Sequence, residues 1–221
     1  MKKLSKVLCL VLSFVLGLSV LTSCGGAKFD AAGLVKGNLD LVYLNQYTDE
    51  YLELVTLTAD EAQATYDQGI EVEVGYFAEA FGIDLTTCAP SVKEELVSIY
   101  QQLYSHSKYE VGEATETETG YEVSVTIYPI DTMYLVITED CEAFIDEWSL
   151  RNTNGEFSGM EQAEYENLWA QSILDLVKAR MDQVGHMEPQ TITVKVALDE
   201  TDCYVIDDAD FQTIDSLIIQ Y

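Results

Sequence analysis

The chain has 221 residues and a formal net charge of −28 at pH 7, with 39 acidic side chains against 11 basic ones. This imbalance argues against a protein that grips nucleic acid, because binding to phosphates needs clustered lysine and arginine. Hydrophobic residues make up 48% of the chain, which excludes intrinsic disorder and is enough for one sizeable domain or two small ones.

The first 23 residues are organised like a secretory signal peptide. Lys2, Lys3 and Lys6 precede an apolar run over residues 7–21, which is shorter than the roughly 20 residues that span a bilayer. The run ends in Leu21-Thr22-Ser23-Cys24. These four residues resemble the lipobox of bacterial lipoproteins. An ordinary secretory signal followed by an incidental cysteine is the alternative interpretation.

The resemblance implies that Cys24 becomes the N-terminus and carries a diacylglycerol and an N-acyl chain such as palmitate. Residues 24–29 would then be a lipidated tether, and residues 30–221 a single extracytoplasmic domain on the outer face of the bacterial cytoplasmic membrane. Two or three acyl chains bind a bilayer firmly, whereas one myristoyl chain binds only marginally. Cleavage removes three lysines and no acidic residue, so the formal charge changes from −28 to −31.

Helical patterns dominate the first half of this domain. Apolar spacing predicts a helix over 30–45, and Thr48 precedes a short helix from Asp49 to Val55. Thr58 and Glu61 have capping-box spacing. Residues 70–74 alternate like a strand, but apolar residues at gaps of three and four over the longer window favour a helix that ends near Gly82.

The next helix is predicted from a second capping box at Ser91 and Glu94 to about His106. Two hairpins are predicted further along, each from a period of two in apolar residues. The first pairs a strand at 109–111 with 121–127, and the second pairs 192–198 with 203–206.

Between the hairpins, residues 133–137 are predicted as a short strand or a linker, followed by a helix over 138–150. The strongest helical pattern opens at 158–161 and ends at Gly185. After the second hairpin, Asp207 is predicted to cap a last helix.

The order helix, histidine, hairpin occurs twice, at His106 and His186, which suggests an internal duplication. Because a single hairpin is marginally stable, the two hairpins are expected to form one four-stranded antiparallel sheet with helices on one face. This α+β arrangement resembles cystatin-like and NTF2-like folds. The body also resembles uncharacterised lipoproteins of Gram-positive anaerobes, through the lipobox and the hairpin Lys108-Tyr109-Glu110-Val111 … Tyr121-Glu122-Val123. Neither resemblance implies an activity.

The candidate chemistry of the chain is sparse. His106 and His186 fall at predicted helix C-termini, where an imidazole can meet free carbonyl groups. The acidic run from Asp199 to Asp210 lacks the order of an EF-hand loop and is explained by a turn and a helix cap. Three cysteines remain in the body, and small core residues explain them as well as a disulfide does: Cys88, Cys141 and Cys203. We predict no catalytic residue, cofactor or metal ligand, and Cys24 alone as a site residue.

The leading interpretation is a lipid-anchored, non-enzymatic binding or interaction module of the cell envelope, with a protein, peptide or glycan as ligand. An exposed apolar or tyrosine-rich patch would support it, and Tyr43, Tyr47 and Tyr51 are the first candidates. The alternative for these tyrosines, and the commoner one at this spacing, is the solvent-facing edge of a core. One alternative is an envelope hydrolase with an acid in an apolar NTF2-like pocket. Another is weak calcium binding.

Overall fold

The computed structural model describes residues 20–21, 29–200 and 202–221. The chain folds into two compact units that are interleaved in sequence. Unit 1 contains the residues up to Gly69, Ser107–Pro129 and Glu188–Ile218. Unit 2 contains Ile70–His106, Ile130–Met187 and Ile219–Tyr221. The single domain predicted over 30–221 remains a prediction.

Unit 1 is built on the predicted four-stranded antiparallel sheet. Its strands are β2 (Lys108–Glu116), β3 (Gly120–Tyr128), β4 (Gln190–Leu198) and β5 (Cys203–Ile206). The strand order β5-β4-β3-β2 joins the two hairpins through the β3–β4 pair, for example at Val123 opposite Val194. A further strand of two residues, β1 (Val20–Leu21), lies in the predicted signal peptide and pairs with β5.

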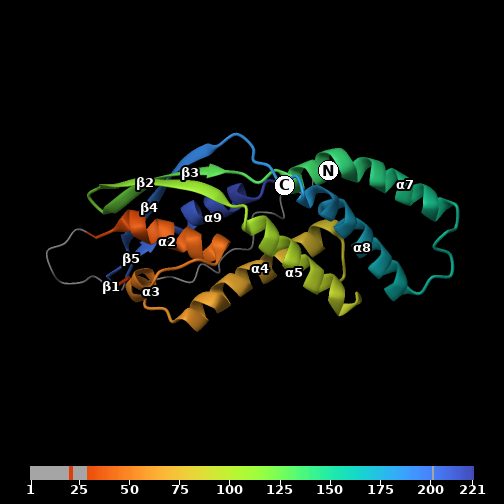
Figure 1. Cartoon of the computed structure of the whole chain (residues 1–221), viewed down its shortest axis with the longest axis horizontal. Helices are drawn as coiled ribbons and strands as arrows, with labels where there is room; N and C mark the ends of the chain where they lie inside the picture. The colour runs from red at the N-terminus through yellow and green to blue at the C-terminus, as the bar shows by residue number, and fades with distance from the viewer. Residues whose placement is uncertain (1–19, 22–28, 201) are drawn as a thin grey trace. The chain divides into compact units, whose positions relative to one another are not determined.

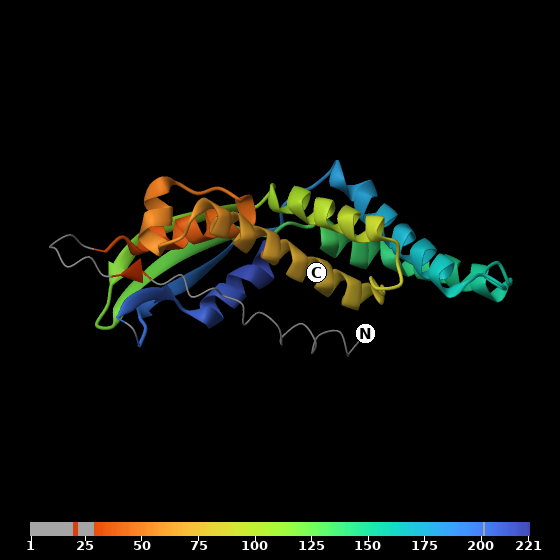
Figure 2. The same cartoon turned by 90° about the horizontal axis from the view of Figure 1, so that it is seen from below.

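Two helices cover one face of this sheet, as predicted. Helix α2 (Ala31–Leu44) contacts β2 and β3, and helix α9 (Asp208–Ile218) contacts β3 and β4 (Figures 1 and 2). The buried core residues of the unit come from both layers: Leu34, Val35, Leu39, Val123, Val125, Ile127, Val194, Val196, Phe211 and Ile214. They account for the alternation in the strands and the helical spacing in α2 and α9.

Side-chain caps begin two helices of unit 1 where the sequence predicted them. Thr48 Oγ1 accepts a hydrogen bond from the Tyr51 amide at the start of α3 (Asp49–Val55). Thr58 and Glu61 form a reciprocal capping box at the start of α4 (Ala59–Phe81). Helix α4 continues through residues 70–74, so the strand alternative for that segment is wrong.

Unit 2 is helical in its described residues. The later part of α4 is followed by α5 (Pro90–Tyr104), α6 (Thr132–Leu135), the π-helix η1 (Val136–Asp140), α7 (Cys141–Thr153) and α8 (Gln162–Met181). Helix α8 contacts α5, α6 and η1. The buried residues include apolar side chains of every one of these helices: Phe77, Leu96, Leu103, Met133, Val136, Trp148, Ile173, Leu174 and Val177.

Three predictions about helix boundaries in unit 2 are wrong. Helix α5 starts at Pro90 with Ala89 as an uncapped N-cap residue, so no capping box forms at Ser91. Proline suits the first position because its fixed φ is helical and its missing N–H needs no partner there. Helix α8 ends at Met181, short of Gly185.

The third error concerns residues 133–137, which are helical and not a strand or linker. A short apolar run cannot distinguish strand from helix by its pattern. Here the neighbouring helix decides the outcome. Arg180 on α8 donates two hydrogen bonds of 2.8 Å to the Asp140 carboxylate and a third to Glu139, which fastens η1 to α8. This guanidinium keeps the pKa of Asp140 below its usual value.

Candidate functional site

The face of the sheet opposite α2 and α9, which we call the outer face, is a polar surface of unit 1. Alternate residues of β2, β3 and β4 share this face because directly opposed residues in an antiparallel pair point the same way. Opposed pairs include Lys195 with Glu122 and Thr193 with Ser124. Thr126 and Tyr128 are half-buried, and the other residues of the outer face are exposed. The outer face consists of the following residues: Lys108, Glu110, Glu122, Ser124, Thr126, Tyr128, Thr191, Thr193 and Lys195.

Contacts between side chains order one end of the outer face. The Tyr128 hydroxyl donates a 2.8 Å hydrogen bond to Glu110, and the Lys108 ammonium lies 4.1 Å from the centre of the Tyr128 ring. The hydroxyls of Thr126 and Thr191 are 2.8 Å apart. The hydrogen bond to Glu110 raises the pKa of Tyr128, because it holds the phenolic proton. Tyr128 is therefore a fixed, neutral aromatic side chain within a polar surface.

The outer face also carries basic groups that differ from the other described ones. Five other basic side chains lie within ion-pair distance of a carboxylate: Lys36, Lys93, Arg151, Lys178 and Arg180. Among the described residues, Lys108 and Lys195 make no ion pair of this kind. In a chain with so many acids, these two ammonium groups are available to a ligand.

A second polar cluster is buried in unit 2 around Glu73, which is 8% exposed. Tyr104 donates to one carboxylate oxygen at 3.0 Å and Tyr221 to the other at 3.1 Å. Tyr221 lies 2.8 Å from the Tyr100 hydroxyl and can accept its proton. Burial raises the pKa of Tyr100 and of Tyr221 well above the usual value, with Glu73 adding to the effect.

Glu73 therefore meets part of the hydrolase expectation, an acid in buried surroundings. Each of its two oxygens, however, accepts a hydrogen bond from a tyrosine of the chain itself. An ionised carboxylate is an acceptor only, and this arrangement satisfies it. We interpret the cluster as an internal brace that fastens the end of the chain to α4 and α5.

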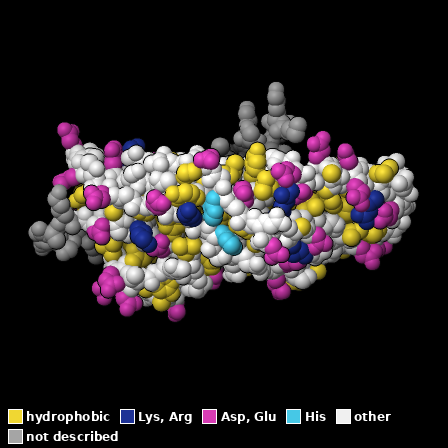
Figure 3. All heavy atoms as spheres, turned by 45° about the horizontal axis from the view of Figure 1, so that its top comes forward, with side chains coloured by type: hydrophobic (Ala, Val, Ile, Leu, Met, Phe, Trp, Pro, Cys, Tyr) yellow, Lys and Arg dark blue, Asp and Glu magenta, His cyan; other side chains and the backbone are white. Residues whose placement is uncertain are grey.

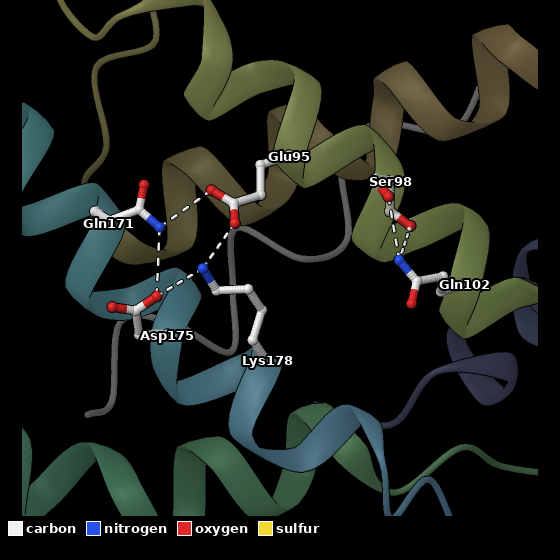
Figure 4. Close-up of polar contacts among 6 residues, drawn as sticks. All are labelled: Glu95, Ser98, Gln102, Gln171, Asp175 and Lys178. Carbon is white, nitrogen blue, oxygen red and sulfur yellow. Dashed lines mark hydrogen bonds and ion pairs between the residues drawn. The ribbon is translucent and has the colours of Figure 1, made fainter.

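A third cluster joins α5 to α8 on the surface of unit 2 (Figure 4). Lys178 lies between Glu95 and Asp175, at 2.7 and 2.6 Å, and Gln171 donates to Glu95 at 3.1 Å. The ammonium of Lys178 keeps the pKa of Asp175 below its usual value. Such half-exposed ion pairs contribute on the order of 0.5 kcal/mol or less each, so the cluster is a modest structural link.

The candidate tyrosine patch is not an exposed surface, and its residues follow the alternative interpretation, the edge of a core. Tyr43 is fully buried, Tyr51 is 6% exposed, and only Tyr47 is half-buried. The Tyr43 hydroxyl donates to Asp215 on α9 at 3.0 Å. The Tyr51 ring packs against Gly37, where a Cβ atom would meet it at 2.1 Å. Tyrosines at this spacing lie between helices in the core. The outer face was missed, although the polar positions of the predicted hairpins mark it.

The remaining sequence candidates have structural roles. His186 Nε2 lies 2.9 Å from the carbonyl oxygen of His106, so its ring meets a carbonyl just beyond the end of α5 (histidines in cyan, Figure 3). In the acidic run, Asp207 accepts two amide protons at the start of α9, and Asp199 accepts that of Cys203. These contacts confirm the turn and cap interpretation.

Acidic side chains are scattered over the displayed surface rather than gathered into one patch (Figure 3). Within the described ranges, no cluster of three or more His, Cys, Asp or Glu side chains could hold a metal ion. The three body cysteines are buried: Cys88, Cys141 and Cys203. The signal peptide over 1–23 lies outside the described residues except for Val20 and Leu21. Cys24 and residues 25–28 of the tether also lie outside the described residues.

One solved structure shares the fold of this chain. No family model matches the sequence, and no curated protein matches it. A solved structure from Bacillus subtilis, of the "putative lipoprotein" YcdA, is similar with a TM-score of 0.58 over 87% of this chain. The identity is 14%, and this chain spans 56% of that one. No helix in the described part of the chain is long and apolar enough to cross a bilayer. The fold is thus shared with a protein described as a lipoprotein.

Proposed function

We propose that the chain is a lipid-anchored, non-enzymatic module of the bacterial cell envelope that binds a peptide or glycan on the outer face of its sheet. The anchor rests on the lipobox resemblance of Leu21-Thr22-Ser23-Cys24. The fold shared with a protein described as a lipoprotein supports it.

The outer face is the observation that carries the binding part of this proposal. It combines hydroxyl groups, a fixed tyrosine and two ammonium groups that pair with no described carboxylate, all on one sheet surface. Peptides and glycans offer many hydrogen-bonding groups, and the half-buried Tyr128 ring adds apolar contact at low entropic cost. The Glu73 carboxylate, by contrast, is enclosed by tyrosine hydroxyls, which favours a structural role for it.

Lipidation is tested by growing cells with an alkyne-tagged fatty acid and detecting label on the full-length protein. The chain is expected to incorporate the label, and Cys24→Ala to abolish it, because no thiol remains at the lipobox. Cys88→Ala, which removes a buried thiol instead, should leave labelling unchanged. Label on the Cys24→Ala protein would show that the anchor is elsewhere.

Ligand binding is tested by thermal unfolding with a panel of envelope peptides and glycans. A ligand at 100 times its Kd should stabilise the protein by about 2.7 kcal/mol. The double variant Lys108→Ala/Lys195→Ala is expected to bind that ligand with an affinity about tenfold lower or more. The control Lys93→Ala removes an ion-paired lysine of unit 2 and should leave the affinity unchanged. Equal binding by all three proteins would place the ligand away from the outer face, and no shift with any compound would contradict a peptide or glycan ligand.

A further inference from the structure

Phe29 is held by an aromatic cluster in unit 1. Its ring stacks on Tyr204 with centroids 4.1 Å apart and lies 5.9 Å from the Tyr121 ring. Tyr121 and Tyr204 also contact each other edge to face at 5.5 Å. Aromatic pairs in this range stabilise beyond their buried area by about 0.5–1.5 kcal/mol. The last residue of the tether, Phe29, therefore has a fixed place on the sheet.

That place is the end of the sheet where both hairpin turns lie, which we call the turn end. Tyr121 is the second residue of β3 after the turn at 117–119, and Tyr204 is the second residue of β5 after the turn at 199–202. In the uncleaved chain, Leu21 pairs with Cys203 at the same end. The described residues on both sides of Cys24 thus meet the sheet at the start of β5.

The covalent distance from the anchor to this cluster is short. Cys24 and Phe29 are five residues apart, so their Cα atoms are separated by at most about 18 Å. Strand β3 has nine residues, so its opposite end is roughly 27 Å further along the sheet. We propose that the turn end of the sheet faces the phospholipid headgroups, with the strands directed away from the bilayer. This inference rests on the lipid anchor at Cys24.

The charge of the turn end indicates how it meets the bilayer. Both hairpin tips are acidic and carry no lysine or arginine: Glu113, Glu116, Glu118, Asp199, Glu200 and Asp202. Anionic headgroups repel such a surface over a Debye length, which is about 10 Å at 0.1 M salt. The anchor therefore holds the turn end near the membrane, while its charge is repelled by the headgroups. The strands should then stand away from the membrane surface, and the outer face should remain accessible.

Energy transfer to acceptor-labelled lipid headgroups tests this orientation. The lipidated full-length protein is reconstituted in phosphatidylcholine vesicles with a donor dye on Thr119→Cys at the turn end or on Glu188→Cys at the opposite end of unit 1. Both positions are exposed, and the unsubstituted protein controls for reaction at the buried cysteines. Transfer is expected to be clearly higher from position 119. Replacing a third of the lipid by phosphatidylglycerol should lower it at low salt, and adding salt should restore it.

A tether control separates anchoring from orientation. Inserting about twelve Gly and Ser residues after Gly26 lets the sheet move and turn further from the anchor, so transfer from position 119 should fall toward that from 188. Equal or higher transfer from position 188 on retained protein would overturn the orientation while the anchor stands. Protein that fails to remain on the vesicles would overturn the anchor, and the orientation with it.

Discussion

Replacing Glu73 with alanine is expected to lower the free energy of unfolding by about 3 kcal/mol. The change removes a buried side chain and takes the acceptor from Tyr104 and Tyr221, whose hydroxyls bond to it at 3.0 and 3.1 Å. Leaving a buried donor without a partner costs about 1–3 kcal/mol, and the cavity adds to that cost. This effect should be among the largest of any single polar substitution in unit 2.

Urea unfolding followed by tryptophan fluorescence measures this effect selectively. The two tryptophans, Trp148 and Trp169, both belong to unit 2 and lie in one aromatic cluster, with ring centroids 5.1 Å apart. Glu73→Gln is the matched variant, because it keeps the shape and one acceptor, and should cost about 1 kcal/mol. Removing the negative charge should also lower the pKa of Tyr100 and Tyr221, seen as earlier ionisation in alkaline absorbance titration. A midpoint for Glu73→Ala equal to that of the parent would refute the brace.

Asp215→Asn is expected to stabilise unit 1 at pH 7.5 by about 2 kcal/mol and to have little effect at pH 4. Burial raises the pKa of Asp215 to about 6, only partly offset by the hydrogen bond from Tyr43. The folded state therefore favours the protonated carboxyl. Its stabilising contribution is full below the unfolded pKa of about 3.9 and is lost as the pH rises through 6. Asparagine has no charge to bury and keeps an oxygen for Tyr43.

Amide hydrogen exchange of β3 and β4, at several pH values, follows unit 1, which contains no tryptophan. The difference between variant and parent should grow between pH 4 and pH 7. Asp208→Asn is the control, because it removes an exposed acid in the first turn of the same helix. That change should lower the free energy of unfolding by about 0.3–1 kcal/mol, because it removes a favourable interaction with the helix dipole, whereas Asp215→Asn should raise it. A gain that does not depend on pH would contradict a raised pKa at Asp215.

Local patterns predicted most of the secondary structure. Helix α4 was identified from apolar spacing over 23 residues, which outweighed five alternating residues, and it is continuous from Ala59 to Phe81. The alternation of apolar residues predicts the strands, and the preference of aspartate for helix caps predicts Asp207 as the cap of α9. These features depend on residues two to four positions apart, so one sequence is sufficient to recognise them.

The candidate sites depend on contacts between distant residues, which no local pattern encodes. Glu73 meets Tyr221, 148 residues away, and Tyr43 meets Asp215, 172 residues away. The tyrosine spacing at 43, 47 and 51 was recognised, but its burial depended on α9 and Gly37. Only the outer face could have been deduced, because the predicted hairpins already assign their polar residues to one side.

The pairing of β3 with β4 has a consequence for how the chain folds. Val123 meets Val194 only after 71 positions of chain are looped out, and residues 130–187 of that loop belong to unit 2. Closing a flexible loop of this length costs about 4 kcal/mol in entropy, and contacts this far apart in sequence slow folding. A helical unit that forms early would shorten the effective loop. We therefore expect refolding in two phases, with tryptophan fluorescence recovering before the sheet amides are protected. Variants that weaken the Glu73 brace should slow the second phase as well as the first.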